Sequence, residues 1–192
     1  PFLVMATQNP IETEGTYPLP EAQIDRFMMK VLVDYPSEDE EFVIVERVTG
    51  PPVEVAAVAT TAQLAQLQRE CRSAYVDPAL ITYAVKLVAA TRVPAKAGLK
   101  DLAKYVAFGA SPRATICLIE GARALAFLRG RAYVLPEDLL DLTGDVLRHR
   151  ISLTYEALAD GMTADMLVER IVKALPAPAK PLSHDERATV NG

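Results

Sequence analysis

Hydrophobic side chains recur at helical spacing through most of the chain after residue 60. The clearest stripe falls at positions i, i+3, i+4, i+7 and i+8, and it consists of Leu80, Tyr83, Ala84, Leu87 and Val88. Such a stripe is the face that an amphipathic helix buries. Patterns of this kind predict a bundle of about five helices. The predicted helices cover residues 62–71, 112–129, 136–150 and 168–175, and a further one begins at residue 78.

The starts of these helices carry local signals. Asp77 precedes Pro78 and Ser111 precedes Pro112, so that a capping side chain stands before a proline at the first helical position. Pro136 is followed by two acidic residues, which suit the positive end of a helix dipole. These signals predict three well-defined helix N-termini.

The first part of the chain has a different pattern. Two continuous apolar runs, 2–7 and 28–33, are typical of strands that a parallel sheet buries on both faces. The loop between them is rich in Pro and carboxylates and leads into a short helix over 20–27. Ser37 and Glu40 form a capping-box pattern, which predicts another helix. The residues expected on the inner side of that helix are Phe42, Val45 and Val48.

An Ala/Val/Pro connector over 50–60 separates these two patterns. We therefore expect a mainly α fold, in which a two-strand α/β segment (1–55) precedes a helical bundle (56–175) and a flexible tail (176–192). A domain seldom begins inside its own core, yet the apolar run starts at the second residue. We therefore expect this chain to be the C-terminal part of a longer protein.

Charge and composition narrow the class of protein. The 192 residues carry a net charge of -5 and contain no long basic run, which argues against nucleic-acid binding by bulk electrostatics. Cys71 and Cys117 are far apart and form no CxxC motif, so we expect no disulfide framework and a reducing cytoplasm. No apolar run is long enough for a membrane-spanning helix, and we expect no membrane insertion.

Conventional catalytic motifs are absent from the sequence. His149 and His184 are the only histidines, one near a helix end and one in the tail, so we expect neither a His-based triad nor a metal cluster, and no metal ligands. The sequence contains neither GxxxxGK[ST] nor GxGxxG, so this chain has no phosphate-binding loop of these types.

Three residues nevertheless have the chemistry of a nucleotide site. Asn9 follows the first apolar run, where an amide could bind a phosphate and an attacking water, although Asn before Pro is also common turn chemistry. Arg26 ends the short helix and could act as an arginine finger on a neighbouring subunit. Its alternatives are a salt bridge with Asp25 or Asp34, or a solvated helix end.

Arg113 is the third candidate. It is the second residue of the helix that Ser111 caps, where the helix dipole already attracts anions. Because a cation is locally unfavourable there, it calls for an anionic partner, which could be a ligand phosphate or a carboxylate of this chain. By contrast, Arg148 and Arg150 near a helix end are expected only to complement the dipole.

Longer motifs resemble those of a known family. Residues 6–27, "ATQNPIETEGTYPLPEAQIDRF", resemble the corresponding segment of the MoxR family of AAA+ ATPases. Residues 75–92, 109–139 and 149–157 look like the same family's lid domain. The resemblance covers nearly the whole chain except the tail.

The resemblance implies roles for the three candidates. Asn9 would be sensor 1, Arg26 the arginine finger, and Arg113 sensor 2 of the lid. The family's P-loop and its Mg²⁺-binding acidic motif would lie upstream of Pro1, so ATP and Mg²⁺ would be cofactors of the full-length protein. Family sheets have the order 5-1-4-3-2, which implies that the first strand would lie between the two strands of this chain. We therefore expect the N-terminal quarter to be held irregularly and the fragment to be inactive alone.

The resemblance also implies a ring, expected to be hexameric, that uses ATP hydrolysis to remodel or mature client protein complexes. A partner with a von Willebrand factor type A domain would be typical. Two alternatives remain open at the level of sequence: a non-enzymatic helical adaptor, and a helix-turn-helix DNA reader, which the acidic balance disfavours.

Overall fold

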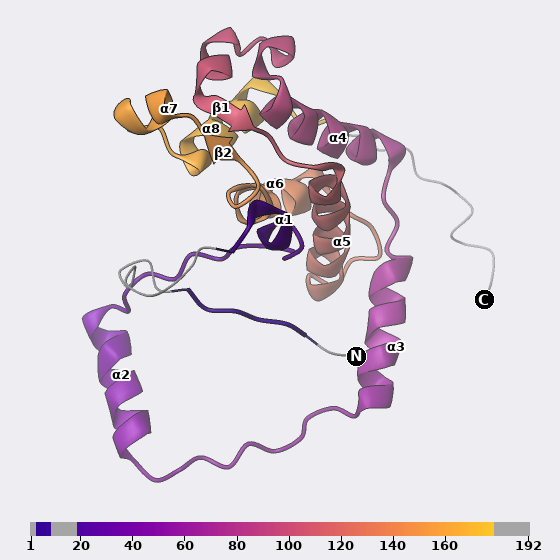
Figure 1. Ribbon diagram of the computed structural model, residues 1–192. Coiled ribbons are helices and arrows are strands. Elements are labelled where there is room, and N and C mark those ends of the chain that lie inside the picture. The colour runs from indigo at the N-terminus through magenta and orange to yellow at the C-terminus, as the bar shows by residue number, and fades with distance from the viewer. Residues whose placement is uncertain (1–2, 9–18, 179–192) are drawn as a thin grey trace, which may run out of the picture.

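The computed structural model describes residues 3–8 and 19–178 of the chain. Most of this part is helical, as Figure 1 shows, and the expected mainly α fold is confirmed. The helices before the bundle are α1 (Glu21–Ile24), α2 (Glu38–Thr49) and α3 (Thr61–Ser73). Those of the bundle are α4 (Pro78–Arg92), α5 (Pro112–Leu128), α6 (Pro136–Leu147), α7 (Tyr155–Ala159) and α8 (Ala164–Ala174).

Local capping fixes the helix starts where the sequence predicts them. The side chains of Asp77 and Ser111 accept hydrogen bonds from the backbone N–H groups of Ala79 and Arg113, at 2.8 and 3.2 Å. In α2, the Ser37–Glu40 capping box is complete, with the carboxylate accepting from the Ser37 N–H at 2.9 Å. Each cap satisfies donors that the first helical turn leaves free.

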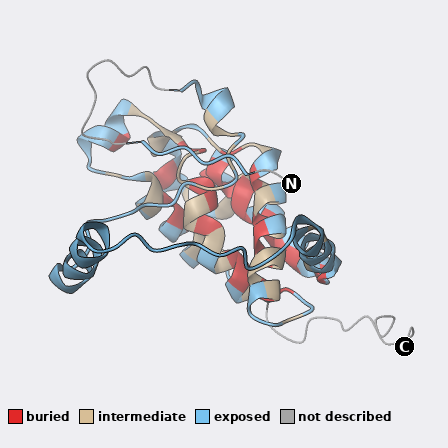
Figure 2. Ribbon diagram, turned by 90° about the horizontal axis from the view of Figure 1, so that it is seen from below, coloured by how far each residue is buried: buried red, intermediate tan, exposed pale blue. Residues whose placement is uncertain are grey.

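The core lies between α4, α5, α6 and α8, and Figure 2 shows the buried residues gathered there. Its largest side chains are fully buried aliphatic residues: Leu80, Leu87, Leu102, Leu118, Leu139, Leu147, Leu167 and Ile171. Burying each such side chain contributes about 1.5–3 kcal/mol. The helical stripes therefore hold this part of the molecule together.

Short elements that the sequence patterns do not predict connect the helices. Two 3-10 helices, Pro94–Ala97 and Lys100–Tyr105, follow α4 and lead into strand β1 (Val106–Phe108). This strand pairs antiparallel with β2 (Ser152–Leu153), with Val106 opposite Leu153. The small sheet brings the segment before α5 next to the segment after α6.

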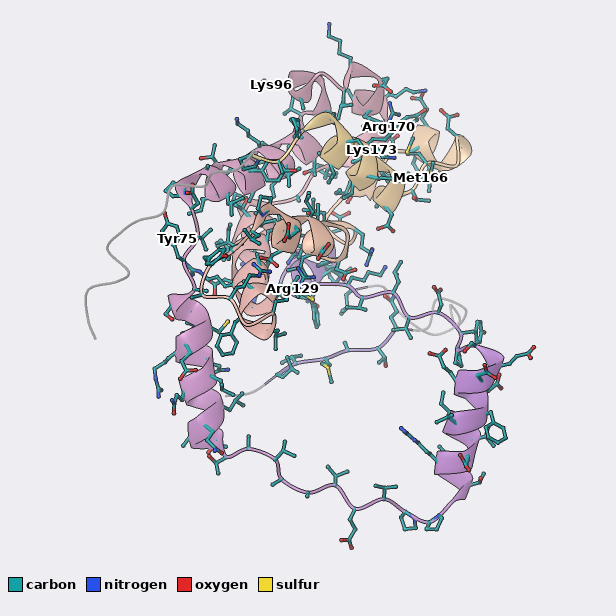
Figure 3. The ribbon with its side chains drawn as sticks, turned by 180° about the vertical axis from the view of Figure 1, so that it is seen from behind. Tyr75, Lys96, Arg129, Met166, Arg170 and Lys173 are labelled. Atoms are coloured by element: carbon teal, nitrogen blue, oxygen red, sulfur yellow. The ribbon has the colours of Figure 1, made fainter. Side chains whose placement is uncertain are left out.

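A buried carboxylate joins the end of α5 to the start of α6. Asp138 is fully buried and accepts hydrogen bonds from Arg129, at 2.8 Å, and from Arg131 through both carboxylate oxygens, at 2.6 and 2.7 Å. Figure 3 marks Arg129 at this link. Burial alone would raise the pKa of Asp138, but the hydrogen bonds from Arg131, the Leu135 N–H and Arg129 outweigh it and lower this pKa.

The N-terminal part has no sheet in the described residues. Residues 3–8 and 29–37 run without strand pairing, although their apolar sequences predict strands. A strand needs a hydrogen-bonded neighbour, and the implied order 5-1-4-3-2 would leave these two segments apart. In the described part of this quarter, the segments outside α1 and α2 are irregular.

Helix α2 corrects one expectation. Phe42, Val45 and Val48 were expected to face a core, but their side chains are 68%, 54% and 79% exposed. The helix stands away from the bundle between two extended segments (Figures 1 and 2), so no element within residues 3–8 and 19–178 covers its apolar side. Helix α3 lies closer and contacts α5.

Candidate functional site

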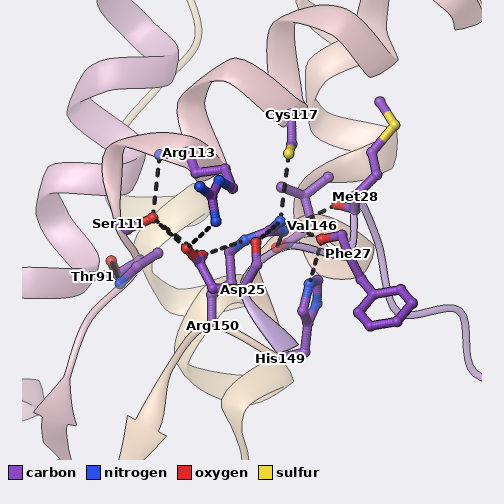
Figure 4. Close-up of polar contacts among 11 residues, drawn as sticks. Asp25, Phe27, Met28, Thr91, Ser111, Arg113, Cys117, Val146, His149 and Arg150 are labelled. Atoms are coloured by element: carbon purple, nitrogen blue, oxygen red, sulfur yellow. Dashed lines mark hydrogen bonds and ion pairs between the residues drawn. The ribbon is translucent and has the colours of Figure 1, made fainter. Parts of the chain in front are cut away.

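The turn after α1 docks on the helical bundle. The N–H groups of Arg26 and Phe27 donate to the carbonyls of Gln23 and Ile24, at 3.1 and 3.0 Å, so the chain turns tightly at residues 25–28. Its partners come from α5 and from residues 145–150, more than 80 positions later in the sequence. Figure 4 shows how closely these distant segments meet.

Asp25 lies at the centre of this junction. Its carboxylate accepts from the Ser111 hydroxyl at 3.0 and 3.1 Å, from Arg113 Nη1 at 3.4 Å and from Arg150 Nε at 3.0 Å. Two guanidinium groups and a helix cap therefore share one carboxylate. Hydrogen bonds to a charged acceptor are stronger than neutral ones, so Asp25 ties the turn to both α5 and the end of α6.

Arg150 makes the most extensive contacts of the junction. Its side chain is fully buried and donates to the backbone carbonyls of Asp25 and Met28, both at 3.0 Å, and of Phe27. It also donates to the carbonyl of Val146 at the end of α6. A planar fork with five N–H donors suits such a cluster of acceptors, whereas lysine offers one point charge.

The two residues before Arg150 hold the same segment. Arg148 Nη1 donates to the carbonyl of Lys30 at 2.6 Å, and His149 Nε2 lies 3.2 Å from the carbonyl of Phe27. The N–H of Lys30 donates in turn to the carbonyl of Asp145 at 2.8 Å. Residues 145–150 thus contact the backbone of residues 25–30 along its length.

The environment of His149 favours its neutral form. Burial lowers the pKa of the imidazole, and the positive charges of Arg150 and Lys30 lower it further, against the effect of the Phe27 carbonyl. Because a carbonyl can only accept, the hydrogen lies on Nε2 in this arrangement.

Close backbone packing positions the start of α5. The N–H of Ala110 donates to the hydroxyl of Thr91 at 3.0 Å, and that hydroxyl donates to the carbonyl of Val88 at 2.7 Å. A Cβ on Gly109 would lie 2.5 Å from the carbonyl carbon of Thr91, far inside contact distance. Glycine therefore lets this loop press against the end of α4 and deliver Ser111 and Arg113 to the junction.

The structure brings two of the three candidate residues to this region. Arg113 is 48% exposed and pairs with Asp25, so a carboxylate of the chain itself is its anionic partner here. Arg26 is exposed, and within residues 3–8 and 19–178 its guanidinium forms no ion pair, while the neighbouring Asp25 faces the bundle. Asn9 lies outside the described residues.

The sequence analysis missed the roles of Arg148 and Arg150. Both were expected only to complement a helix dipole, yet their guanidinium groups bind residues 25–30. The sequence signal that could have indicated these roles is the run of three basic residues, 148–150, directly after an amphipathic helix. Their partners lie more than 110 residues away in sequence, so spacing could not reveal them.

The described part of the chain lacks two further features. No group of three or more His, Cys, Asp or Glu side chains is arranged to hold a metal ion there. Among the helices of that part, none has the length and apolarity needed to cross a membrane.

Comparison with known families defines the class of this molecule. The family model of the AAA lid domain matches residues 99–171, which hold α5 to α8 up to Ile171. The model of the ATPase family associated with various cellular activities (AAA) matches residues 1–29, which include the turn that docks on the bundle. The two models thus match the first and the later part of the chain.

Individual relatives narrow the class further. Over 93% of its own length, this chain is 48% identical to Chaperone MoxR1 of Mycobacterium tuberculosis. Over 92% of its own length, it is 34% identical to Protein MoxR of Paracoccus denitrificans. A candidate ATPase from Cytophaga hutchinsonii has a crystal structure that matches 93% of this chain with a TM-score of 0.88 and 42% identity. The chain belongs to the MoxR family of AAA+ ATPases.

The match covers only part of each relative. The chain spans 47% of Chaperone MoxR1, 56% of Protein MoxR and 55% of the Cytophaga hutchinsonii chain. It thus corresponds to about half the length of these proteins.

Proposed function

We propose that this chain is the C-terminal portion of a MoxR-type AAA+ ATPase, which hydrolyses ATP at the subunit interfaces of a ring. Residues 1–55 would be the end of the nucleotide-binding domain and 56–175 the lid, with 176–192 as a flexible tail. The buried core of the described residues begins at Ala74, which lies inside the proposed lid, whereas α3 buries none of its residues. The ring is taken to be hexameric.

Arg113 is the residue of this chain proposed to bind the nucleotide. It stands in the first turn of a 17-residue helix, its side chain is half exposed, and it already holds an oxyanion, the carboxylate of Asp25, at 3.4 Å. A phosphate oxygen offers the same charge and acceptor geometry. The site therefore fits an anionic ligand, and Arg113 would sense the γ-phosphate by exchanging one oxyanion for another.

Arg26 is proposed to act on the nucleotide of the neighbouring subunit. Its side chain is exposed, whereas the carboxylate of the neighbouring Asp25 faces the bundle, and this would let the Arg26 guanidinium reach across an interface. Such a group stabilises the charge that builds up on a transferring phosphoryl group. Asn9 is proposed to orient the attacking water.

ATP supplies the transferable phosphoryl group when bound, and Mg²⁺ neutralises its charge. The P-loop and the acidic ligands for Mg²⁺ are proposed to lie in the preceding part of the full-length protein. The isolated chain is therefore proposed to be inactive.

The biological work of the ring is proposed from the relatives. One of them is named a chaperone, which supports remodelling or maturation of client protein complexes by this protein. A cytoplasmic location and a partner with a von Willebrand factor type A domain are part of the same proposal.

The observation that carries the proposal is the docking of the turn that contains Arg26 on the helical bundle through Asp25, Arg113 and Arg150. The test is ATP hydrolysis by the 192-residue chain and by the full-length protein. We expect no turnover from the first and clear turnover from the second. A full-length protein that forms a ring but hydrolyses no ATP would leave a helical adaptor as the better explanation.

A further inference from the structure

We propose that Arg150 is a positioning residue for Arg26, which fastens the turn at residues 25–28 to the lid and thereby fixes where the Arg26 side chain projects. The inference rests on the proposed role of Arg26 as an arginine finger. It adds that the finger is aimed by a buried guanidinium on the lid rather than by its own helix alone.

Helix α1 is too short to hold the finger by itself. It has four residues, buries none of them and has no side-chain cap at its N-terminus. An isolated helix of this length is unstable in water, because nucleation costs more than so few hydrogen bonds return. The direction of Arg26 must therefore depend on contacts from outside α1.

Arg150 supplies these contacts on both sides of Arg26. It binds the carbonyl and the carboxylate of Asp25 before it, and the carbonyls of Phe27 and Met28 after it. The same guanidinium donates to the Val146 carbonyl, which belongs to the fully buried end of α6. One side chain thus links the backbone around the finger to the core of the lid.

The sharing of Asp25 adds a connection to the proposed sensor. Arg113 contacts this carboxylate at 3.4 Å, whereas Ser111 and Arg150 contact it at 3.0 Å. If Arg113 moves to a nucleotide phosphate, Asp25 keeps its bonds to Ser111 and Arg150. The turn then stays attached to the lid while the sensor changes partner, so a movement of the lid carries the finger with it.

The kinetic test uses full-length rings carrying Arg150→Lys, which keeps the charge but loses the fork. We expect an unchanged Kd for ATP and a kcat lowered by about 100-fold, the loss that a misplacement of roughly 1 Å can produce. The control is Arg129→Lys, which alters a half-exposed arginine that pairs with Asp138 and Asp141 instead of the turn. It should keep the wild-type kcat.

A double variant separates positioning from general structural support. In single-turnover assays, Arg150→Lys added to Arg26→Ala should cause no further loss, because Arg150 acts through the finger. The proposal would be overturned if Arg150→Lys had the wild-type kcat. It would also be overturned if Arg150→Lys lowered the rate of Arg26→Ala by the same factor as it lowers that of the wild type. If Arg26→Ala itself leaves turnover unchanged, it is the proposed function that fails.

Hydrogen exchange on the 192-residue chain tests the clamp without activity. In Arg150→Lys, the amides of Phe27 and Lys30 should exchange faster, while those of α4 keep their protection. Unchanged exchange at Phe27 and Lys30 would contradict the clamp. If α4 also loses protection in Arg150→Lys, the milder variant Asp25→Asn replaces it. The exchange of the Phe27, Lys30 and α4 amides, and the kcat with and without Arg26→Ala, are then compared in the same way.

Discussion

Arg150 donates more of the side-chain hydrogen bonds that hold the turn at residues 25–28 on the bundle than any other described residue. It is fully buried, pairs with the carboxylate of Asp25 and satisfies four backbone carbonyls. A buried ion pair contributes little net stability compared with an apolar pair, but removing one partner is costly. Without Arg150, four backbone carbonyls lose a donor, and Asp25 keeps only Ser111 and Arg113. Loss of Arg150 should therefore be far more damaging than loss of an exposed arginine.

Arg150→Met in the 192-residue chain tests this expectation. We expect it to lower the free energy of unfolding by about 3–5 kcal/mol, measured by urea denaturation. Arg170→Met is the matched control, because it breaks an exposed Arg–Asp pair with Asp101 and should leave the urea midpoint near that of the wild type. Equal midpoints for the two variants would contradict the importance assigned to Arg150.

His149 should make the junction sensitive to mild acid. Its pKa is lowered in the folded chain, chiefly by burial, below the value of about 6.5 expected for an unfolded chain. Between these two values the unfolded chain binds more protons, so stability falls as pH drops below about 6.5 and through the folded pKa. At higher pH the full stability is present.

His149→Gln should weaken this dependence, because a glutamine amide can donate to the Phe27 carbonyl without titrating. We expect the Tm of the wild type to fall more steeply than that of the variant between about pH 7.5 and about pH 5.5. His184→Gln removes the other histidine of the chain and should keep the wild-type slope. Parallel slopes for the wild type and His149→Gln would refute the assignment.

At the scale of elements, the loop before α5 decides where Ser111 and Arg113 lie. Gly109→Ala places a Cβ 2.5 Å from the backbone of Thr91, which cannot yield without moving the end of α4. We expect a loss of about 1–3 kcal/mol of stability, as for other overpacked sites. In the full-length protein, the affinity for ATP should fall as well, because Arg113 is displaced. Thermal unfolding and ATP binding measure the two effects, and a variant unaltered in both would contradict this role of the loop.

The sequence predicts elements well where their signals are local. The caps at Asp77 and Ser111 and the apolar stripe of α4 gave helices within a few residues of those observed. The runs at 2–7 and 28–33 form no strands in the described residues, since strands depend on neighbours that spacing cannot supply. Strands of two or three residues, such as β1 and β2, are too short to leave a pattern.

The candidate site could be predicted only in part for a related reason. Arg113 stood out because a cation at a helix N-terminus is locally unfavourable. Arg150 did not stand out, because a cation near a helix C-terminus already has a local explanation. Its actual partners, Asp25, Phe27 and Met28, are joined to it only by the tertiary fold.

At the scale of the whole molecule, the described residues comprise a packed lid and an N-terminal segment that is anchored to it around residues 21–30. The anchor joins residues 25–30 to α5 and the end of α6, whereas residues 3–8 and α2 remain largely exposed. The most firmly held part of the N-terminal segment is thus the turn that carries Arg26. This arrangement would let a movement of the lid carry Arg26 with it, as proposed above.

The most direct test of this account is the turnover of ATP by full-length rings carrying Arg26→Ala, with Arg170→Ala as the control on an exposed arginine of the lid. We expect Arg26→Ala to lower kcat by about 10³-fold or more while ATP binding and ring size stay unchanged, and the control to behave as wild type. Wild-type turnover by an Arg26→Ala ring of normal size would contradict the account.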